Sequence, residues 1–113
     1  MIKRITGAVE TRSRAVVHDG LVFTVATAAK KSPSLYEQTR ETLAAIDKNL
    51  ADAGSHKSRI LSATVYITDM AGKPEMNRAW DEWVDMANPP QRACIGAALE
   101  GDTLVEILVT AAQ

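Results

Sequence analysis

Apolar and polar residues alternate along the first third of the chain, which is the pattern of half-buried β-strands. An opening strand is expected within residues 2–9. Two further apolar runs, residues 15–18 and 21–25, stand on either side of Asp19-Gly20. Asp-Gly between two such runs is the strongest short-range sign of a β-hairpin, because tight hairpin turns need residues that tolerate positive φ. The first third is therefore predicted to form three consecutive strands.

The segment from about Ser34 to Ala53 repeats its apolar residues at intervals of three and four, the period of an amphipathic helix. Ser34 is a good N-cap, and Glu37 follows at the capping-box distance. Gly54 is the expected stop after the last turn. The buried stripe is predicted to contain Leu35, Thr39, Leu43, Ile46, Leu50 and Ala53.

A second helix and three more strands are predicted in the rest of the chain. The helix begins near Pro74 and ends at Asn88-Pro89-Pro90, because proline is favoured in a first helical turn and interrupts a helix elsewhere. Its buried stripe is expected to contain Met76, Ala79, Trp80, Trp83, Val84 and Ala87. Strands are expected at residues 60–68, 92–99 and 103–111. In the first of them, the residues predicted to share one face are Leu61, Ala63, Val65 and Ile67.

The predicted order of elements is therefore β-β-β-α-β-α-β-β, in one domain that spans residues 1–113. Helices that alternate with strands favour an α+β fold, with one mixed sheet and both helices on one face. The other sheet face also looks apolar in the later strands. Because an isolated chain would leave that face in water, we expect a homo-oligomer that packs through it.

With 46% apolar and 24% charged residues, the chain has the composition of an ordinary globular domain. No apolar run approaches the ~18 residues that cross a bilayer, and no secretory signal is present, so a cytoplasmic protein without membrane contact is expected. A single cysteine and two separated histidines predict neither a disulfide nor a metal site. The 13 basic and 14 acidic residues form no concentrated positive stripe, so nucleic-acid binding is not expected.

Glu106 is the most unusual polar residue, because its strand is apolar on both faces. It shares a face with Leu104 and Leu108. A carboxylate in that position is expected to lose water and to serve as a general acid or base. The alternative is a structural glutamate in a salt bridge or at an exposed strand edge, and we favour the functional interpretation.

A second candidate site follows Pro89-Pro90, where Arg92 enters a strand of small residues that leaves room for a small ligand. The planar guanidinium of arginine matches the two oxygens of a carboxylate. Cys94 lies on the same face, and Asn77 lies early in the second helix. From the residues alone, the alternatives are a surface ion pair for Arg92, a buried thiol for Cys94 and local backbone hydrogen bonding for Asn77.

The segment Pro89-Pro90-Gln91-Arg92-Ala93-Cys94, followed by Val105-Glu106-Ile107, resembles the C-terminal signature of the Rid family, the reactive intermediate deaminases. This family is also called YjgF and has carried the label endoribonuclease L-PSP. The resemblance spans about residues 12–112. Supporting segments are Glu37-Gln38-Thr39, residues 61–69, and residues 76–83, the last of which is most similar to the YoaB-type branch.

This resemblance implies a chorismate-mutase-like fold and a homotrimer formed through the open sheet face, with three active sites in clefts between subunits. It implies hydrolysis of enamine and 2-imino acid intermediates to 2-keto acids and ammonia, without a cofactor or a metal. Arg92 matches the residue that clamps the substrate carboxylate, and Glu106 matches the one that activates water. Cys94 is implied to line the pocket without acting as a nucleophile, and Asn77 to lie near it.

Arg12 and Val25 stand where the well-studied branch has a pocket tyrosine and a pocket serine, so the resemblance implies an altered pocket for the substrate side chain. Arg12 and Arg14 are expected to favour a polar or acidic side chain. Two other functions stay open. One is a non-catalytic regulatory or chaperone-like trimer that binds a small carboxylate, and the other is a ribonuclease, which the near-neutral charge disfavours. The deaminase interpretation requires Arg92 and Glu106 to face one cleft.

Overall fold

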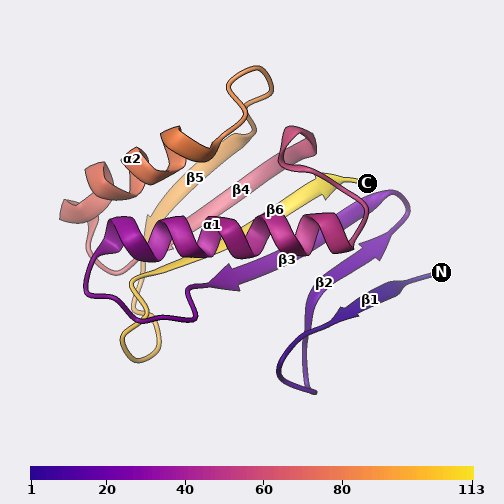
Figure 1. Ribbon diagram of the computed structural model, residues 1–113, viewed down its shortest axis with the longest axis horizontal. Helices are drawn as coiled ribbons and strands as arrows, with labels where there is room; N and C mark the ends of the chain where they lie inside the picture. Colours follow the sequence, from indigo (N-terminus) through magenta and orange to yellow (C-terminus); the bar gives the residue numbers. More distant parts are fainter.

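The computed structural model describes residues 1–113 and contains one six-stranded sheet with two helices packed against one face (Figure 1). The strands are β1 (Lys3–Thr6), β2 (Ser13–His18), β3 (Leu21–Thr27), β4 (Ile60–Ile67), β5 (Gln91–Gly96) and β6 (Val105–Ala112). The helices are α1 (Leu35–Asp52) and α2 (Lys73–Trp83), and short 3-10 turns occupy Lys57–Arg59 and Met70–Gly72. The predicted order β-β-β-α-β-α-β-β and the α+β class are confirmed.

The last strand of the chain, β6, lies inside the sheet. The strand order is β1-β2-β3-β6-β4-β5, and β6 is antiparallel to both β3 and β4. β4 and β5 are parallel. The connection through α2 returns the chain to the end of the sheet at which β4 begins, so β5 runs in the same direction. Neither helix is long and apolar enough to cross a membrane.

The hairpin and the ends of α1 form where their residue types predict. Asp19 and Gly20, between β2 and β3, have φ values of 50° and 77°. The Ser34 hydroxyl oxygen accepts a hydrogen bond from the backbone N–H of Glu37 at 3.1 Å and so caps α1. Gly54, with a φ of 81°, follows the last turn and ends the helix.

One face of the sheet forms the core together with the helices. The α1 residues predicted to be buried are all buried, and alternate residues of β6 face them: Val105, Ile107, Val109 and Ala111. Met76, Ala79 and Trp80 of α2 complete this layer. Because side chains alternate along a strand, the intervening residues of β6, beginning with Glu106, face away from the helices.

Helix α2 ends earlier than predicted, at Trp83, and Ala87 is exposed. Val84 is already extended, with φ −60° and ψ 146°. The Asp85 carboxylate then accepts hydrogen bonds from the Asn88 side-chain N–H at 3.2 Å and from the Ala87 backbone N–H at 3.0 Å, and these lower the pKa of Asp85. This local turn replaces helical hydrogen bonds, so the helix stops before the prolines.

Strand β4 contains an irregularity that the alternating pattern did not predict. Its pairing with β6 shifts between Ile60 and Ser62, and Leu61 is displaced from the alternation. Ile60 is 5% exposed and joins the core, whereas Leu61 is 52% exposed. The prediction that Leu61 shares one face with Ala63, Val65 and Ile67 is therefore wrong.

The sheet face opposite the helices is left uncovered by the chain. Strand pairing places Val25 beside Leu108 and Phe23 beside Thr110 on this face. Large apolar residues that are exposed there include Phe23, Val25, Ile95 and Leu108. The predicted apolar open face is present, and its exposure in one chain is a physical reason to expect a partner.

Arg14 connects the N-terminal strands to α1. The β1–β2 register skips Arg14, as in a β-bulge, and its side chain reaches the helix. The guanidinium donates to the Asn49 side-chain oxygen at 2.8 Å and to the Asp52 carboxylate at 2.6 Å. The hydrogen bond from Arg14 and a second one from Lys48 hold the pKa of Asp52 below its usual value.

Replacing Asp52 by asparagine is expected to reduce the loss of stability in acid. A carboxyl group whose pKa is lowered by folding stabilises the fold above its unfolded pKa, and this contribution is lost as pH falls through the folded value. Urea unfolding from about pH 6 down to about pH 2.5 measures this difference. Asp81→Asn, an exposed change on α2, is the matched control. Equal pH dependence in wild type and Asp52→Asn would contradict the role of the Arg14–Asp52 pair.

Candidate active site

Arg92 enters β5 directly after the two prolines, and its side chain lies on the helix side of the sheet. One guanidinium N–H donates to the Asn77 side-chain oxygen at 2.7 Å, and another lies 3.7 Å from the sulfur of Met76. The guanidinium carbon is 5.1 Å from the centre of the Trp80 ring. Arg92 is half-buried and makes no ion pair. Neutral side chains of α2 therefore hold the guanidinium and leave several of its donors free.

Cys94 lies two residues along β5, on the same side of the sheet as Arg92. It is a free, half-buried cysteine that packs against the hydrophobic core. Its neighbour in β4 is Val65, one of the fully buried core residues. The structure thus places Cys94 on the same side of the sheet as Arg92, as the alternation of side chains predicted. It also places Asn77 in hydrogen-bond contact with Arg92, near which the resemblance implied it would lie.

Glu106 lies on the opposite, open face of the sheet. Strand β6 pairs it with Thr27 of β3 on one side and with Tyr66 of β4 on the other. Glu106 is half-buried, and its carboxylate makes no hydrogen bond or ion pair within the chain. In a single chain β6 is therefore buried on one face only, and not on both as its apolar sequence suggested.

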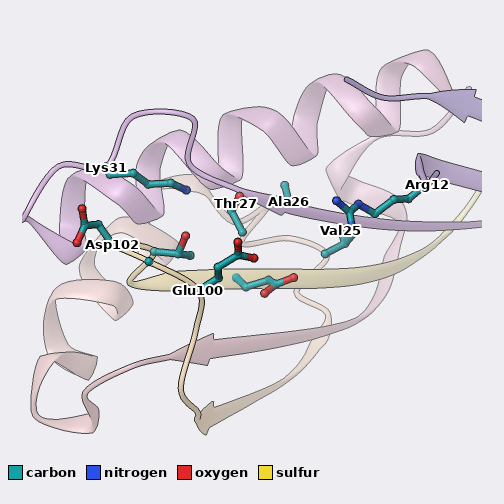
Figure 2. A pocket seen from close by; sticks show the side chains of 10 residues that line it. Arg12, Val25, Ala26, Thr27, Lys31, Glu100 and Asp102 are labelled. Carbon is teal, nitrogen blue, oxygen red and sulfur yellow. The ribbon is translucent and has the colours of Figure 1, made fainter. Parts of the chain in front are cut away.

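A cavity of about 590 Å³ opens beside Glu106 (Figure 2). Its walls come from the segment before β2, the end of β3 and the loop before β6, and its polar lining includes Arg12, Thr27, Lys31, Glu100 and Asp102. Val25 lines the same cavity, so three residues singled out in the sequence, Arg12, Val25 and Glu106, meet here. The volume suits a small metabolite. No three His, Cys, Asp or Glu side chains of the chain lie close enough together to hold a metal ion.

The candidate site residues fall into two groups in a single chain. We call one group the clamp residues, which are Arg92, Cys94 and Asn77, and the other the cavity residues, which are Arg12, Val25 and Glu106. The clamp residues lie on the helix side at the edge strand β5, and the cavity residues lie around β3 and β6 on the open side. Strand β4 separates β5 from β6. One chain therefore does not bring Arg92 and Glu106 into one cleft.

Arg14, which the sequence analysis placed beside Arg12, does not line the cavity. Its guanidinium is bound to Asn49 and Asp52 of α1, on the helix side. Arg12 itself is exposed, lines the cavity and makes no side-chain hydrogen bond or ion pair. Of the two arginines expected to favour a polar or acidic substrate side chain, only Arg12 therefore lies where it could contact one.

Gln38 is a buried residue of α1 that the sequence analysis did not assign to the site. Its side-chain N–H groups donate to the backbone oxygens of Ser32 at 2.7 Å and Asp102 at 3.0 Å. Its side-chain oxygen accepts from the backbone N–H of Leu104 at 2.9 Å. Gln38 is 0% exposed, so its side-chain amide must find its partners within the protein, and these three hydrogen bonds supply them.

These contacts make Gln38 the support of one cavity wall. Residues 100–103 form that wall beside Glu106, and Gln38 holds the loop that contains them from beneath. The sequence carries a signal for this role, because Gln38 occupies a position on the buried stripe of α1, one turn after Leu35. A glutamine among buried apolar positions must find polar partners within the protein.

The variant Gln38→Ala is expected to lower the free energy of unfolding by about 1–3 kcal/mol, because it leaves the Leu104 N–H and the Asp102 carbonyl without partners. Urea unfolding measures the loss, and hydrogen exchange of the Leu104 amide measures whether the wall loosens. Gln91→Ala, an exposed change on β5, serves as the control. Unchanged exchange at Leu104 would show that Gln38 does not support the wall.

The comparisons with known proteins agree with this fold. The chain matches, over residues 2–113, the family model described as endoribonuclease L-PSP. A RutC family protein from Haemophilus ducreyi is 46% identical over 102 residues, which cover 88% of this chain and 87% of that protein. The RutC family protein YoaB from Escherichia coli strain K12 is 37% identical over 101 residues, which cover 88% of this chain and 89% of YoaB.

A solved structure shows the same architecture. The crystal structure of a YjgF family member from Neisseria meningitidis superposes with a TM-score of 0.95 at 36% sequence identity. The match covers 100% of this chain and 95% of that one. The agreement of the family model, the relatives and the fold shows that this chain belongs to the YjgF family, also known as the RutC or Rid family, and that it is similar to YoaB.

Proposed function

We propose that this protein hydrolyses enamine and 2-imino acid intermediates to 2-keto acids and ammonia, without a cofactor. Arg92 binds the carboxylate of the substrate, and Glu106 activates the attacking water. Cys94 lines the pocket beside Arg92, and Asn77 orients the guanidinium. The family membership supports this proposal, and so do the surroundings of Arg92 and of Glu106.

The observation that carries the proposal is that the Arg92 guanidinium has no carboxylate partner within the chain. A half-buried arginine normally pairs with a carboxylate, yet Arg92 is held by an amide oxygen, a thioether sulfur and an aromatic ring. None of these neutralises its charge. Its remaining N–H donors can therefore form the paired hydrogen bonds that a carboxylate accepts, which makes Arg92 a pre-oriented anion site.

Glu106 supplies the second part of the chemistry. Its carboxylate is half-buried, has no partner within the chain and faces a cavity of about 590 Å³. A protonated imine carbon is electrophilic, so a water molecule can add to it while Glu106 takes a proton from the water. Glu106 then returns that proton to the nitrogen. As the C–N bond breaks, the new hydroxyl group gives its own proton to Glu106, so that a keto acid and ammonia leave. Cys94 is not needed as a nucleophile because water forms the only new bond.

The two charged residues belong, in this proposal, to different subunits of one active site. They lie on opposite faces of the sheet in a single chain, and the face that bears Glu106 is apolar and uncovered. A homotrimer packed through this open face buries its apolar residues and brings the edge strand β5 of one subunit toward β6 of the next. Three clefts between subunits then each contain Arg92 from one chain and Glu106 from another.

A non-catalytic carboxylate-binding protein is the second candidate function. The Arg92 site alone is sufficient to hold a small carboxylate, and it does not depend on Glu106. This function predicts saturable binding of 2-keto acids without imine turnover. The ribonuclease activity named by the family model has less support here, because a net charge of −1 gives no strong attraction for phosphates.

A trapping assay tests the proposed activity. Amino-acid oxidases with catalase generate 2-imino acids, and semicarbazide traps the imine that survives. Wild-type protein is expected to lower the trapped imine, and Arg92→Ala is expected to remove the effect while the oligomer persists. Arg40→Ala, an exposed change on α1, is the control. A folded, oligomeric wild-type protein that leaves every imine untouched would favour the binding protein.

A mixing experiment tests whether one active site draws on two chains. Arg92→Ala and Glu106→Gln are each expected to be inactive alone. Refolded together at equal amounts, they are expected to recover about a quarter of the wild-type rate, because each mixed cyclic trimer regains one intact site. No recovery from correctly assembled mixed trimers would show that both residues act within one chain.

The substitution Asn77→Asp tests whether the Arg92 guanidinium must lack a carboxylate partner in its own chain in order to bind the substrate. The new carboxylate would sit 2.7 Å from the guanidinium nitrogen and compete with the substrate carboxylate for it. The KM for an imino acid is expected to rise by about tenfold, and by less in Asn77→Ala, which removes the contact without adding charge. Equal effects of the two variants would mean that Arg92 does not bind the substrate carboxylate.

A further inference from the structure

Arg12 is a cationic residue of the cavity that the proposed reaction does not use. It comes from the segment between β1 and β2 and lines the same cavity as Glu106. Its guanidinium makes no hydrogen bond and no ion pair, in contrast to Arg14, which is bound to α1. The cavity therefore contains an arginine whose five donors are available to a ligand.

The two ends of the cavity differ in charge (Figure 2). Lys31 lies at one end together with Glu100 and Asp102, so that this end presents both signs of charge. Arg12 lies at the other end beside Val25, whose short apolar side chain offers no competing acceptor. Lys31 also donates a hydrogen bond to the Ala28 backbone oxygen, so of the two cations Arg12 is the one whose side chain has no hydrogen-bond partner or ion pair within the chain.

In the trimer proposed above, the complete site contains two arginines that make no ion pair within their own chains. Arg92, contributed by one chain, binds the carboxylate next to the imine carbon, and Arg12 lies in the cavity that holds Glu106. A substrate that satisfies both guanidinium groups carries two carboxylates, one at each end. A neutral side chain would leave Arg12 hydrated but unused.

We infer that the preferred substrates are 2-imino dicarboxylic acids, with Arg12 binding the carboxylate of the side chain. This inference rests on the proposed function for the chemistry at the imine carbon and on the proposed trimer for bringing Arg92 and Arg12 into one site. The contact of Arg12 with the side-chain carboxylate forms a charge-assisted hydrogen bond pair, which discriminates against an uncharged side chain of the same length.

Binding of two keto acids of equal length tests the inference without requiring turnover. The probes are 2-oxoglutarate, which has two carboxylates, and 2-oxopentanoate, which has one. In calorimetric titrations of the full-length oligomer, 2-oxoglutarate is expected to bind about tenfold more tightly. In Arg12→Ala the two probes are expected to bind with nearly equal affinity. Arg12→Lys is expected to retain part of the preference, because it keeps the charge but loses the planar fork.

Two variants separate a local contact from a general effect of charge. Arg4→Ala removes a positive charge on β1, outside the residues that line the Glu106 cavity, and is expected to keep the preference. Lys31→Ala removes the cation at the other end and is expected to change the preference less than Arg12→Ala. A larger effect of Arg4→Ala or Lys31→Ala than of Arg12→Ala would overturn the assignment to Arg12.

Imine hydrolysis provides the second measurement. The ratio of kcat/KM for the imino acid of glutamate to that of norvaline is expected to be about ten in wild type and about one in Arg12→Ala. Turnover of both imines without a preference for the dicarboxylate would refute the inference and leave the proposed function standing. A preference for 2-oxoglutarate in binding that Arg12→Ala removes, without turnover of either imine, would refute the proposed function and leave standing only the assignment of Arg12 to a second carboxylate.

Discussion

The alternation of side chains along a β-strand is the constraint on which the rest of the structure depends. In β6, Val105 and Ile107 enter the core beneath the helices, so Glu106 between them must face the other side. In β5 the same rule directs Arg92 and Cys94 toward α2. The sheet itself therefore separates the two charged residues within one chain, and the proposed reaction requires a second chain to bring them together.

The packing of the fold leaves an apolar surface on which a second chain could pack. Both helices cover one face, and the open face exposes Phe23, Val25 and Leu108 in a region that also contains Glu106. Apolar burial and catalysis are thus proposed to occur at the same surface, so that assembly would complete the site. The cavity within each chain is held in shape by buried hydrogen bonds, above all those of Gln38 to the loop that precedes β6.

Local signals predicted most of the fold, because they depend on residues that are neighbours in sequence. The Asp19-Gly20 turn and the Ser34 cap formed where expected. The bulge at Leu61 and the path of Arg14 to α1 could not be predicted, because both depend on register with a distant partner. The sequence motifs singled out Arg92 and Glu106, and the structure shows that each is a half-buried charged residue without an ion pair. The motifs could not show that they occupy opposite faces, since sheet order is a property of the whole chain.

A crystal structure of the oligomer with 2-oxobutyrate would test the central claim most directly. The account predicts that the ligand carboxylate is paired with Arg92 of one subunit and that its carbonyl carbon lies beside Glu106 of the partner subunit. It also predicts that the open sheet faces are buried against one another. A ligand that contacts Arg92 and Glu106 of the same chain, or that binds without contacting Arg92, would contradict the account.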